Sequence, residues 1–241
     1  MSKTSDIVSF SLDDYITLEI IGDKRLEFLQ GQMTADIHGK SKNLDTLFCN
    51  EKGFIISNAT IIVDKNILII IKKDVSEMLQ SELRKFSKFF RCEINLKEEN
   101  IVGTYDGSNF KKNFSNNKVS KSNQDWDLLK ITNFDYDIDE QTCLRVRPSD
   151  LGYDLGKYVS FTKGCYRGQE IIARLKYLSN KQHTSIVFKN LTEEEHIDLE
   201  SQAKLIYQKK LENDDLSHYS FKTIDQLDES LKIKIIASQL P

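Results

Sequence analysis

The chain has 241 residues, of which 39% are hydrophobic and 29% charged, so it can bury the core of one large domain or of a main domain with a small appendage. The net charge is −3 with basic and acidic residues interspersed, which disfavours a protein that holds nucleic acid by its phosphates, because such proteins carry a basic excess or stripe. The N-terminal segment lacks the layout of a secretory signal, and the strongest apolar run is too short to span a bilayer.

The first predicted elements, in chain order, are a strand, a helix and a hairpin. Residues 14–22 predict a strand that ends at a glycine turn, and Asp23 is placed to cap a helix that has Leu26, Leu29 and Met33 at helical spacing. Residues 44–63 predict a hairpin whose tight corner is Glu51-Lys52-Gly53.

A second helix and more strands follow. After a strand over 67–73, Asp74 and Glu77 have capping-box spacing. The buried stripe of that helix is expected to comprise Val75, Met78, Leu79, Leu83 and Phe86. Further strands are predicted over 92–98 and 101–107. Since these segments do not alternate as strict β-α-β units, the predicted fold class is α+β.

The second half begins with a polar stretch. Residues 107–125 are rich in Asn, Ser and Lys and have no periodicity, which predicts a long surface loop with solvated lysines. Beyond residue 185, three short alternating segments (185–191, 203–210 and 231–238) are separated by polar turns. They predict a small β appendage, in the form of a compact barrel.

The stretch TKGCYRGQE at 162–170 sets one thiol between two glycines. The apolar spacing after it predicts a helix that begins near Arg167 or Gly168, so that Cys165 lies in the turn before a helix N-terminus. That helix end, Lys163 and Arg167 would each lower the pKa of the thiol and favour the reactive thiolate. Gly164 and Gly168 would let a ligand approach the backbone. The alternative is a tight loop in which Cys165 is simply a small residue that fits.

The remaining candidate residues carry weaker signals. Cys49, Cys92 and Cys143 lie in apolar or strand-like runs and are interpreted as small core residues. No C-x-x-C pair suggests a zinc ribbon or a disulfide framework, so a reducing cytoplasm is expected. No metal site is predicted, because the histidines at 38, 183, 196 and 218 lack ligand spacing. The acidic run 137–140 is interpreted as a solvated turn, and neither a Walker motif nor a G-x-G-x-x-G fingerprint occurs.

The segment SFTKGCYRGQEIIAR at 160–174 resembles the signature of the YgfZ-type folate-binding proteins, which are relatives of the glycine-cleavage T-protein. Three other segments are similar to that family in order and spacing. They are 13–37, which contains LQGQMTAD at 29–36, the hairpin segment FCNEKGFIISNATII at 48–62, and DWDLLKI at 125–131. Together these segments cover most of residues 13–183.

The resemblance implies a ring-shaped folate-binding core over residues 1–184 and a short β-barrel-like domain over 185–241. It implies tetrahydrofolate or a derivative as the ligand, with Tyr15 and Trp126 as the aromatic residues against it, since a flat pterin suits an aromatic platform. Gln30 and Gln32 are expected to offer amide hydrogen bonds to the pterin edge. Gln169 and Glu170 complete the predicted folate-binding set.

Three functions follow as hypotheses. The first, favoured by the resemblance, is a folate-dependent accessory factor for the assembly or repair of iron–sulfur enzymes, including enzymes that modify tRNA. Cys165 would be its reactive thiol, and its partners would be iron–sulfur assembly proteins or the iron–sulfur enzymes themselves. The second is a one-carbon transferase, which needs a carboxylate at the folate, and Asp36 and Glu170 are available. The third is a factor that binds tRNA directly. The negative net charge and the missing interleaving of basic and aromatic residues count against it.

Overall fold

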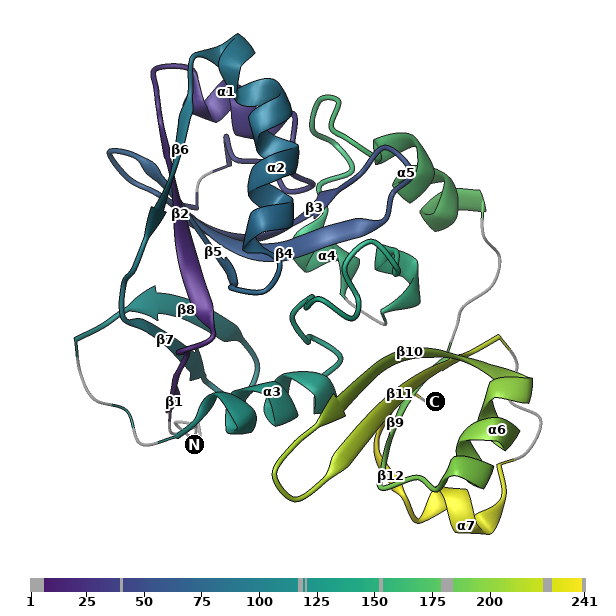
Figure 1. Cartoon of the computed structure of the whole chain (residues 1–241). Helices are drawn as coiled ribbons and strands as arrows, with labels where there is room; N and C mark the ends of the chain where they lie inside the picture. The colour runs from purple at the N-terminus through teal and green to yellow at the C-terminus, as the bar shows by residue number, and fades with distance from the viewer. Residues whose placement is uncertain are drawn as a thin grey trace, which may run out of the picture.

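The computed structural model describes residues 7–39, 41–116, 119, 121–151, 154–178, 184–222 and 227–239. Helices and antiparallel strands are mixed in it, and three separate sheets hold the described strands. Figure 1 shows the largest sheet with two helices on one side, and a C-terminal sheet lying apart from it. The predicted mixture of helix and sheet is therefore confirmed. No described helix is long and apolar enough to cross a membrane.

The five-stranded sheet has the order β3-β4-β5-β2-β6. Its strands are β3 (Asn43–Cys49), β4 (Ile55–Val63), β5 (Ile67–Lys72), β2 (Tyr15–Ile21) and β6 (Glu93–Lys97). Since strand side chains alternate between faces, Ile69 and Ile71 of β5 join the core on one side of the sheet and Ile70 joins the core on the other. The first core is covered by α1 (Arg25–Gln30) and α2 (Ser76–Ser87).

Both predicted helix starts differ from the structure. The helix α1 is shorter than the sequence suggests, and Lys24 precedes it without a side-chain cap. The helix α2 has no side-chain cap either, because the carboxylate of Asp74 instead accepts a hydrogen bond from the backbone of Glu140 at 3.2 Å. Met78, which was predicted to be buried, is 41% exposed. At α2, a tertiary contact thus takes up the carboxylate that local spacing predicts as a cap.

A three-stranded sheet with the order β1-β7-β8 stands against α3 (Asn123–Thr132). Its strands are β1 (Val8–Ser11), β7 (Ile101–Tyr105) and β8 (Phe110–Phe114). The prediction of a long loop over 107–125 is wrong in part, because β8 and the capped start of α3 at Ser122 lie within it. Residues 117, 118 and 120 of that stretch are outside the described residues.

The C-terminal sheet has the order β10-β11-β9-β12. It contains β9 (Thr184–Lys189), β10 (Ala203–Lys210), β11 (Asp215–Phe221) and β12 (Ile235–Ser238), and its apolar core includes residues of α6 (Glu193–Gln202) and α7 (Glu229–Lys232). The ladders of the described strands leave β10 and β12 at the edges, so they do not confirm a closed barrel. The segment 179–183, with His183, lies outside the described residues, and the division into two domains stays a prediction.

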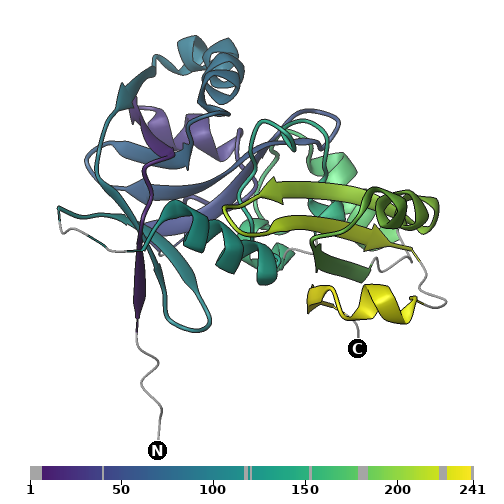
Figure 2. The same cartoon turned by 60° about the horizontal axis from the view of Figure 1, so that its bottom comes forward.

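A central core joins this C-terminal sheet to the rest of the chain. In it the rings of Tyr136 and Tyr207 stack with centroids 4.7 Å apart. Lys209, on β10, forms an ion pair of 3.1 Å with Asp127 of α3, and Figure 2 shows the hairpin of β10 and β11 beside that helix. The short elements η1 (Lys88–Phe90), η2 (Pro148–Asp150) and α4 (Leu155–Tyr158) and the helix α5 (Gln169–Leu178) complete the described structure.

Candidate functional site

Cys165 is the exposed cysteine of the chain. It lies in the turn before α5, close to where the sequence predicts it. Cys49 and Cys92 are buried and Cys143 is half-buried, in agreement with their interpretation as core residues. Burial raises the pKa of Cys49 to about 12 and that of Cys143 to about 11. Solvent access therefore separates Cys165 from the other three thiols, and burial keeps Cys49 and Cys143 protonated near neutral pH.

Lys163 anchors the cysteine loop to the segment that follows α1. Its Nζ donates hydrogen bonds to the backbone oxygens of Gln30 (2.6 Å), Met33 (2.8 Å) and Ala35 (2.8 Å). The side chain is buried, and burial lowers the pKa of Lys163 to about 8 while Asp36 acts to raise it. The two segments TKGCYRGQE and LQGQMTAD are thus joined through one ammonium group.

Arg167 is a second anchor of the same loop. Its backbone N–H donates to the carbonyl of Gly31 at 3.2 Å. Its guanidinium pairs with Glu82 of α2 at 3.0 Å and with Glu51 of the β3–β4 turn at 3.1 Å, and it lies 5.2 Å from the ring centroid of Phe86. The charged groups of both Lys163 and Arg167 therefore hold the backbone of the loop in place through partners other than the thiol.

The two glycines of the loop have different surroundings. Gly168 has a φ of +80°, and a Cβ there would lie 2.6 Å from the backbone oxygen of Asn50, so glycine is needed for the loop to pack on the β3–β4 turn. A Cβ at Gly164 would meet nothing within 4 Å. The close approach at Gly168 is therefore to the protein itself, and Gly164 and Cys165 form the exposed tip.

The glutamines and acids of the two signature segments also contact the chain. Gln30 donates to Asp36 at 3.0 Å and accepts from the backbone of Ile37 at 3.0 Å. Gln32 is buried, and its side-chain oxygen has no hydrogen-bond partner among the described residues. Gln169 accepts from the backbone of Tyr166 at 3.4 Å, whereas Glu170 is exposed on α5.

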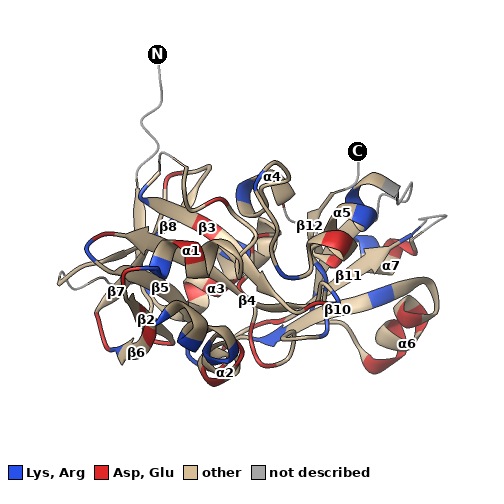
Figure 3. Ribbon diagram, turned by 90° about the horizontal axis from the view of Figure 1, so that it is seen from above, with Lys and Arg blue, Asp and Glu red and all other residues tan. Residues whose placement is uncertain are grey.

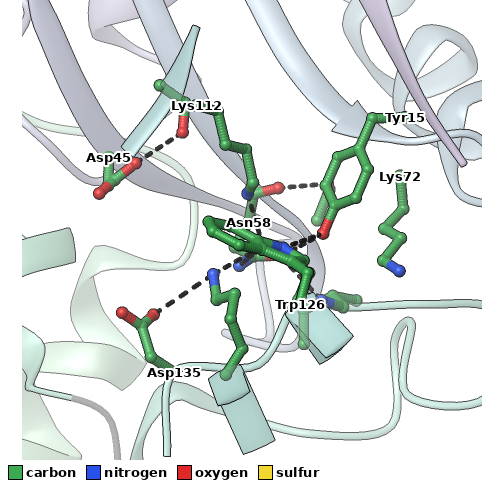
Figure 4. Close-up of polar contacts among 12 residues, drawn as sticks. Tyr15, Asp45, Asn58, Lys72, Lys112, Trp126 and Asp135 are labelled. Atoms are coloured by element: carbon green, nitrogen blue, oxygen red, sulfur yellow. Dashed lines mark hydrogen bonds and ion pairs between the residues drawn. The ribbon is translucent and has the colours of Figure 1, made fainter. Parts of the chain in front are cut away.

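Tyr15 and Trp126 lie together (Figure 4). The indole N–H of Trp126 donates to the Tyr15 hydroxyl at 3.0 Å. Trp126 is fully buried between Phe10 and Phe110, whose ring centroids lie 5.5 and 5.3 Å from that of the indole. Both belong to the core that contains Ile70, whereas α1 packs in the core on the other face of the sheet. The structure thus does not bring the aromatic pair and the glutamines together.

A buried polar cluster surrounds Asp137, next to the aromatic pair. Its carboxylate accepts hydrogen bonds from Lys112 (2.7 Å), Lys130 (3.2 Å), Asn58 (2.7 Å) and the Tyr15 hydroxyl. Burial acts to raise the pKa of Asp137, but Lys112 and Lys130 outweigh burial and hold it well below its usual range. The prediction of a solvated turn over 137–140 is therefore wrong for Asp137, which is 4% exposed.

Sequence reasoning also missed Lys112, which was interpreted as one of the solvated lysines of a loop. Phe110 and Phe114 are the signal that could have placed the Lys112 side chain inward, because residues i, i+2 and i+4 of a strand share one face. Beyond the cluster, an open cleft of about 810 Å³ has Tyr15 in its wall together with Ser11, Leu12, Asp13, Lys73, Glu98, Glu99 and Asn100 among others. Its volume is in the range of pockets that hold small molecules.

No protein-family model matches the chain. Among curated proteins it is 26% identical over 208 residues to an uncharacterized protein of Haemophilus influenzae, with 77% of this chain and 74% of that protein covered. It is 25% identical over 231 residues to the tRNA-modifying protein YgfZ of Colwellia psychrerythraea, with coverages of 76% and 71%. It is 24% identical over 218 residues to the tRNA-modifying protein YgfZ of Hamiltonella defensa, with 69% of this chain and 65% of that protein covered.

Among solved structures, the chain is similar to the glycine cleavage system aminomethyltransferase T of Bartonella henselae. The TM-score is 0.55, and the superposition covers 90% of this chain and 78% of that one at 9% sequence identity. At so low an identity the likeness concerns the fold alone. It confirms that the mixed helices and sheets follow the arrangement of an aminomethyltransferase T.

Proposed function

We propose that this chain, which is a YgfZ-type protein related to the glycine-cleavage T-protein, is a folate-binding accessory protein for the assembly or repair of iron–sulfur enzymes, including enzymes that modify tRNA. One observation carries the proposal: an exposed thiol, Cys165, stands on a loop whose backbone is fixed on both sides of it. A loop that served packing alone would have no need to present its cysteine to solvent.

The chemistry of such a thiol suits this function. A thiolate is a nucleophile and a ligand for iron. Among the described residues, no group of three or more His, Cys, Asp or Glu side chains is arranged to hold a metal ion. A cluster in contact with Cys165 would therefore take its other ligands from a partner enzyme or a small thiol, which fits an accessory role in transfer or repair.

Among the predicted folate residues, Tyr15 is the one in the wall of the open cleft. Its side chain is 3% exposed and its ring lies 4.9 Å from the ammonium group of Lys72 and 5.0 Å from that of Lys112, so only a small part of it can touch a ligand. Trp126 offers no open face for stacking, and its contact with the Tyr15 hydroxyl gives it a supporting role. We place the pterin in this cleft, next to the exposed part of Tyr15. Asp13, Glu98 and Glu99 in the cleft wall repel anions, so the glutamate tail of the folate would point to solvent or toward Lys73.

The alternative of a one-carbon transferase has less support. It needs a carboxylate at the folate, and the two candidates lie with the other site. Asp36 is bound by Gln30 and the backbone of His38, and Glu170 lies on α5. Neither is among the residues that line the cleft beside Tyr15, so a transferase would have to use Asp13, Glu98 or Glu99 of the cleft wall instead of the predicted carboxylates.

The test of the thiol is complementation in cells that lack the protein, with the activity of an iron–sulfur tRNA-modifying enzyme as the readout. We expect Cys165→Ser to fold normally and to fail in restoring that activity. Gly164→Ala is the matched control, because it changes the adjacent residue at the loop tip and retains the thiol. Full rescue by Cys165→Ser would return Cys165 to the role of a small residue in a tight loop.

Folate binding is tested separately with purified protein. Trp126 is the single tryptophan of the chain, and it lies one hydrogen bond from Tyr15. Tetrahydrofolate or 5-formyltetrahydrofolate should change its fluorescence, and Tyr15→Ala should weaken binding by several-fold to tenfold, since an aromatic contact of this kind contributes on the order of 1 kcal/mol. Absence of binding in ligand-observed NMR for every reduced folate would remove folate from the proposal without affecting the thiol.

A further inference from the structure

The end of α2 and the following η1 turn carry the sequence RKFSKFFR over residues 84–91. Four of its eight residues are basic, three are aromatic and none is acidic, in a chain whose net charge is −3. The sequence-based argument against RNA binding relied on the absence of such interleaving. The structure decides which of these side chains face solvent.

The three phenylalanines of this segment have different environments. Phe86 and Phe90 are partly buried against the core beneath α1 and α2, and Phe90 lies 5.7 Å from the ring of Phe28. Phe89 is 81% exposed, the highest value among the large hydrophobic side chains of the described residues. Phe89 therefore offers a ring face to solvent, and its neighbours decide what that ring could contact.

Basic side chains surround this ring. Lys88 and Arg91 flank Phe89, both are exposed, and neither side chain has a hydrogen bond or ion pair with any described residue. Arg84 and Lys85 are exposed one turn earlier on α2, where Arg84 donates to Gln80 and Lys85 pairs with Glu82. Figure 3 shows basic positions on α2. Lys88 and Arg91 are thus the cations that are free to meet a ligand.

We propose that this basic–aromatic surface, formed by Arg84, Lys85, Lys88, Phe89 and Arg91, binds an RNA strand whose bases are accessible, as in a loop or a single-stranded end. Phosphates would contact the cations and one base would stack on Phe89, the combination by which proteins bind unpaired nucleic acid. A bilayer fits less well, since one exposed ring offers little apolar area for insertion.

The position of the surface connects it to the cysteine loop. Arg167, two residues after Cys165, pairs with Glu82 and lies over Phe86, both on α2. An RNA held at the end of α2 would therefore be bound to the same helix that fixes the loop of the thiol. This inference goes beyond the proposed accessory function and does not depend on it.

The test is fluorescence anisotropy of the purified chain with two probes, a labelled oligouridylate of about twelve nucleotides and an unmodified tRNA transcript, over a series of KCl concentrations. We expect the logarithm of the association constant for the oligonucleotide to fall with log salt at about 0.7 per phosphate contact, which gives a slope of about −1.4 from Lys88 and Arg91 alone and of about −3 when Arg84 and Lys85 also exchange their partners for phosphates. The double variant Lys88→Gln/Arg91→Asn should reduce that slope by about 1.4. Asparagine is chosen because Arg91 has a φ of 53°, a left-handed conformation that asparagine tolerates.

Phe89→Ala should weaken binding by about tenfold and leave the salt slope unchanged, because it removes stacking and no charge. The matched control is Lys65→Gln/Lys222→Gln, which removes two exposed charges elsewhere and should bind like the wild type. An equal loss in this control would mean diffuse attraction and would overturn the assignment. So would tight binding of labelled polyglutamate that is insensitive to Phe89→Ala, which would identify an acidic protein as the partner.

Discussion

Replacing Lys163 by methionine tests whether its ammonium group holds the cysteine loop in place. Methionine keeps the length of the stem and removes the charge, so that the backbone oxygens of Gln30, Met33 and Ala35 lose their common donor. The loop would then keep Arg167 and its own packing as attachments to the β3–β4 turn and α2.

The magnitude follows from two opposing contributions. Hydrogen bonds from a charged group stabilise by roughly 1.5 to 3 kcal/mol each, or about 6 kcal/mol for three. Burial costs part of this, since lowering the pKa of Lys163 from 10.5 to about 8 corresponds to roughly 3 kcal/mol at pH 7, where the group is charged in both the folded and the unfolded state. The difference predicts a loss of about 2 to 3 kcal/mol for Lys163→Met. In a protein of this size that lowers the melting temperature by about 5 to 10 °C.

Two measurements check the prediction at pH 7. Unfolding in guanidinium chloride gives the change in the free energy of unfolding, and limited proteolysis shows whether cleavage within residues 160–168 becomes faster. Lys52→Met, at an exposed lysine of the β3–β4 turn, is the control and should cost less than about 0.5 kcal/mol. A loss below 1 kcal/mol with unchanged cleavage would refute the anchoring role of Lys163.

Three further predictions concern positions whose surroundings are equally well defined. Gly168→Ala should lower the free energy of unfolding by about 2 kcal/mol or more, because the new side chain meets both a left-handed φ and the backbone oxygen of Asn50. Gly164→Ala should leave thermal unfolding unchanged, and equal effects of the two substitutions would contradict this account. Asp137→Asn should lower the free energy of unfolding, measured in denaturant, by about 3 to 5 kcal/mol, because it leaves two buried lysines without their shared carboxylate. A change near zero would show that Asp137 does not stabilise these lysines. Burial lowers the pKa of His218 to about 3, so between pH 6.5 and 3 the unfolded chain holds the proton that the folded chain lacks, and stability falls on acidification by up to about 1.4 kcal/mol per pH unit. His218→Phe should flatten that part of the stability profile, and an unchanged profile would assign the acid sensitivity to other groups.

Several elements of the fold can be predicted from local sequence pattern. Apolar patterning predicts the strands β2, β4 and β5, and the turn at Gly53 predicts the hairpin of β3 and β4. The spacing after Gly168 gave α5, and with it the position of Cys165 in the turn before a helix. These predictions succeed because the periodicity of apolar side chains directly reflects which face of a helix or strand is buried. The resemblance of a few long segments then indicated the T-protein-like fold that the structural comparison supports.

The contacts of the charged side chains, in contrast, follow from tertiary packing. Lys163 binds carbonyl groups that lie 128 to 133 residues earlier in the chain, and every residue has a carbonyl, so the sequence carries no sign of this partnership. Asp137 and Lys112 are hydrophilic residues in polar stretches, and they are buried because they neutralise each other where a sheet and a helix meet. The same holds for Phe89, whose exposure depends on which of three neighbouring rings can reach the core. For each of these side chains, partners that are distant in sequence, and not the residue type, decide whether it is buried and what it contacts.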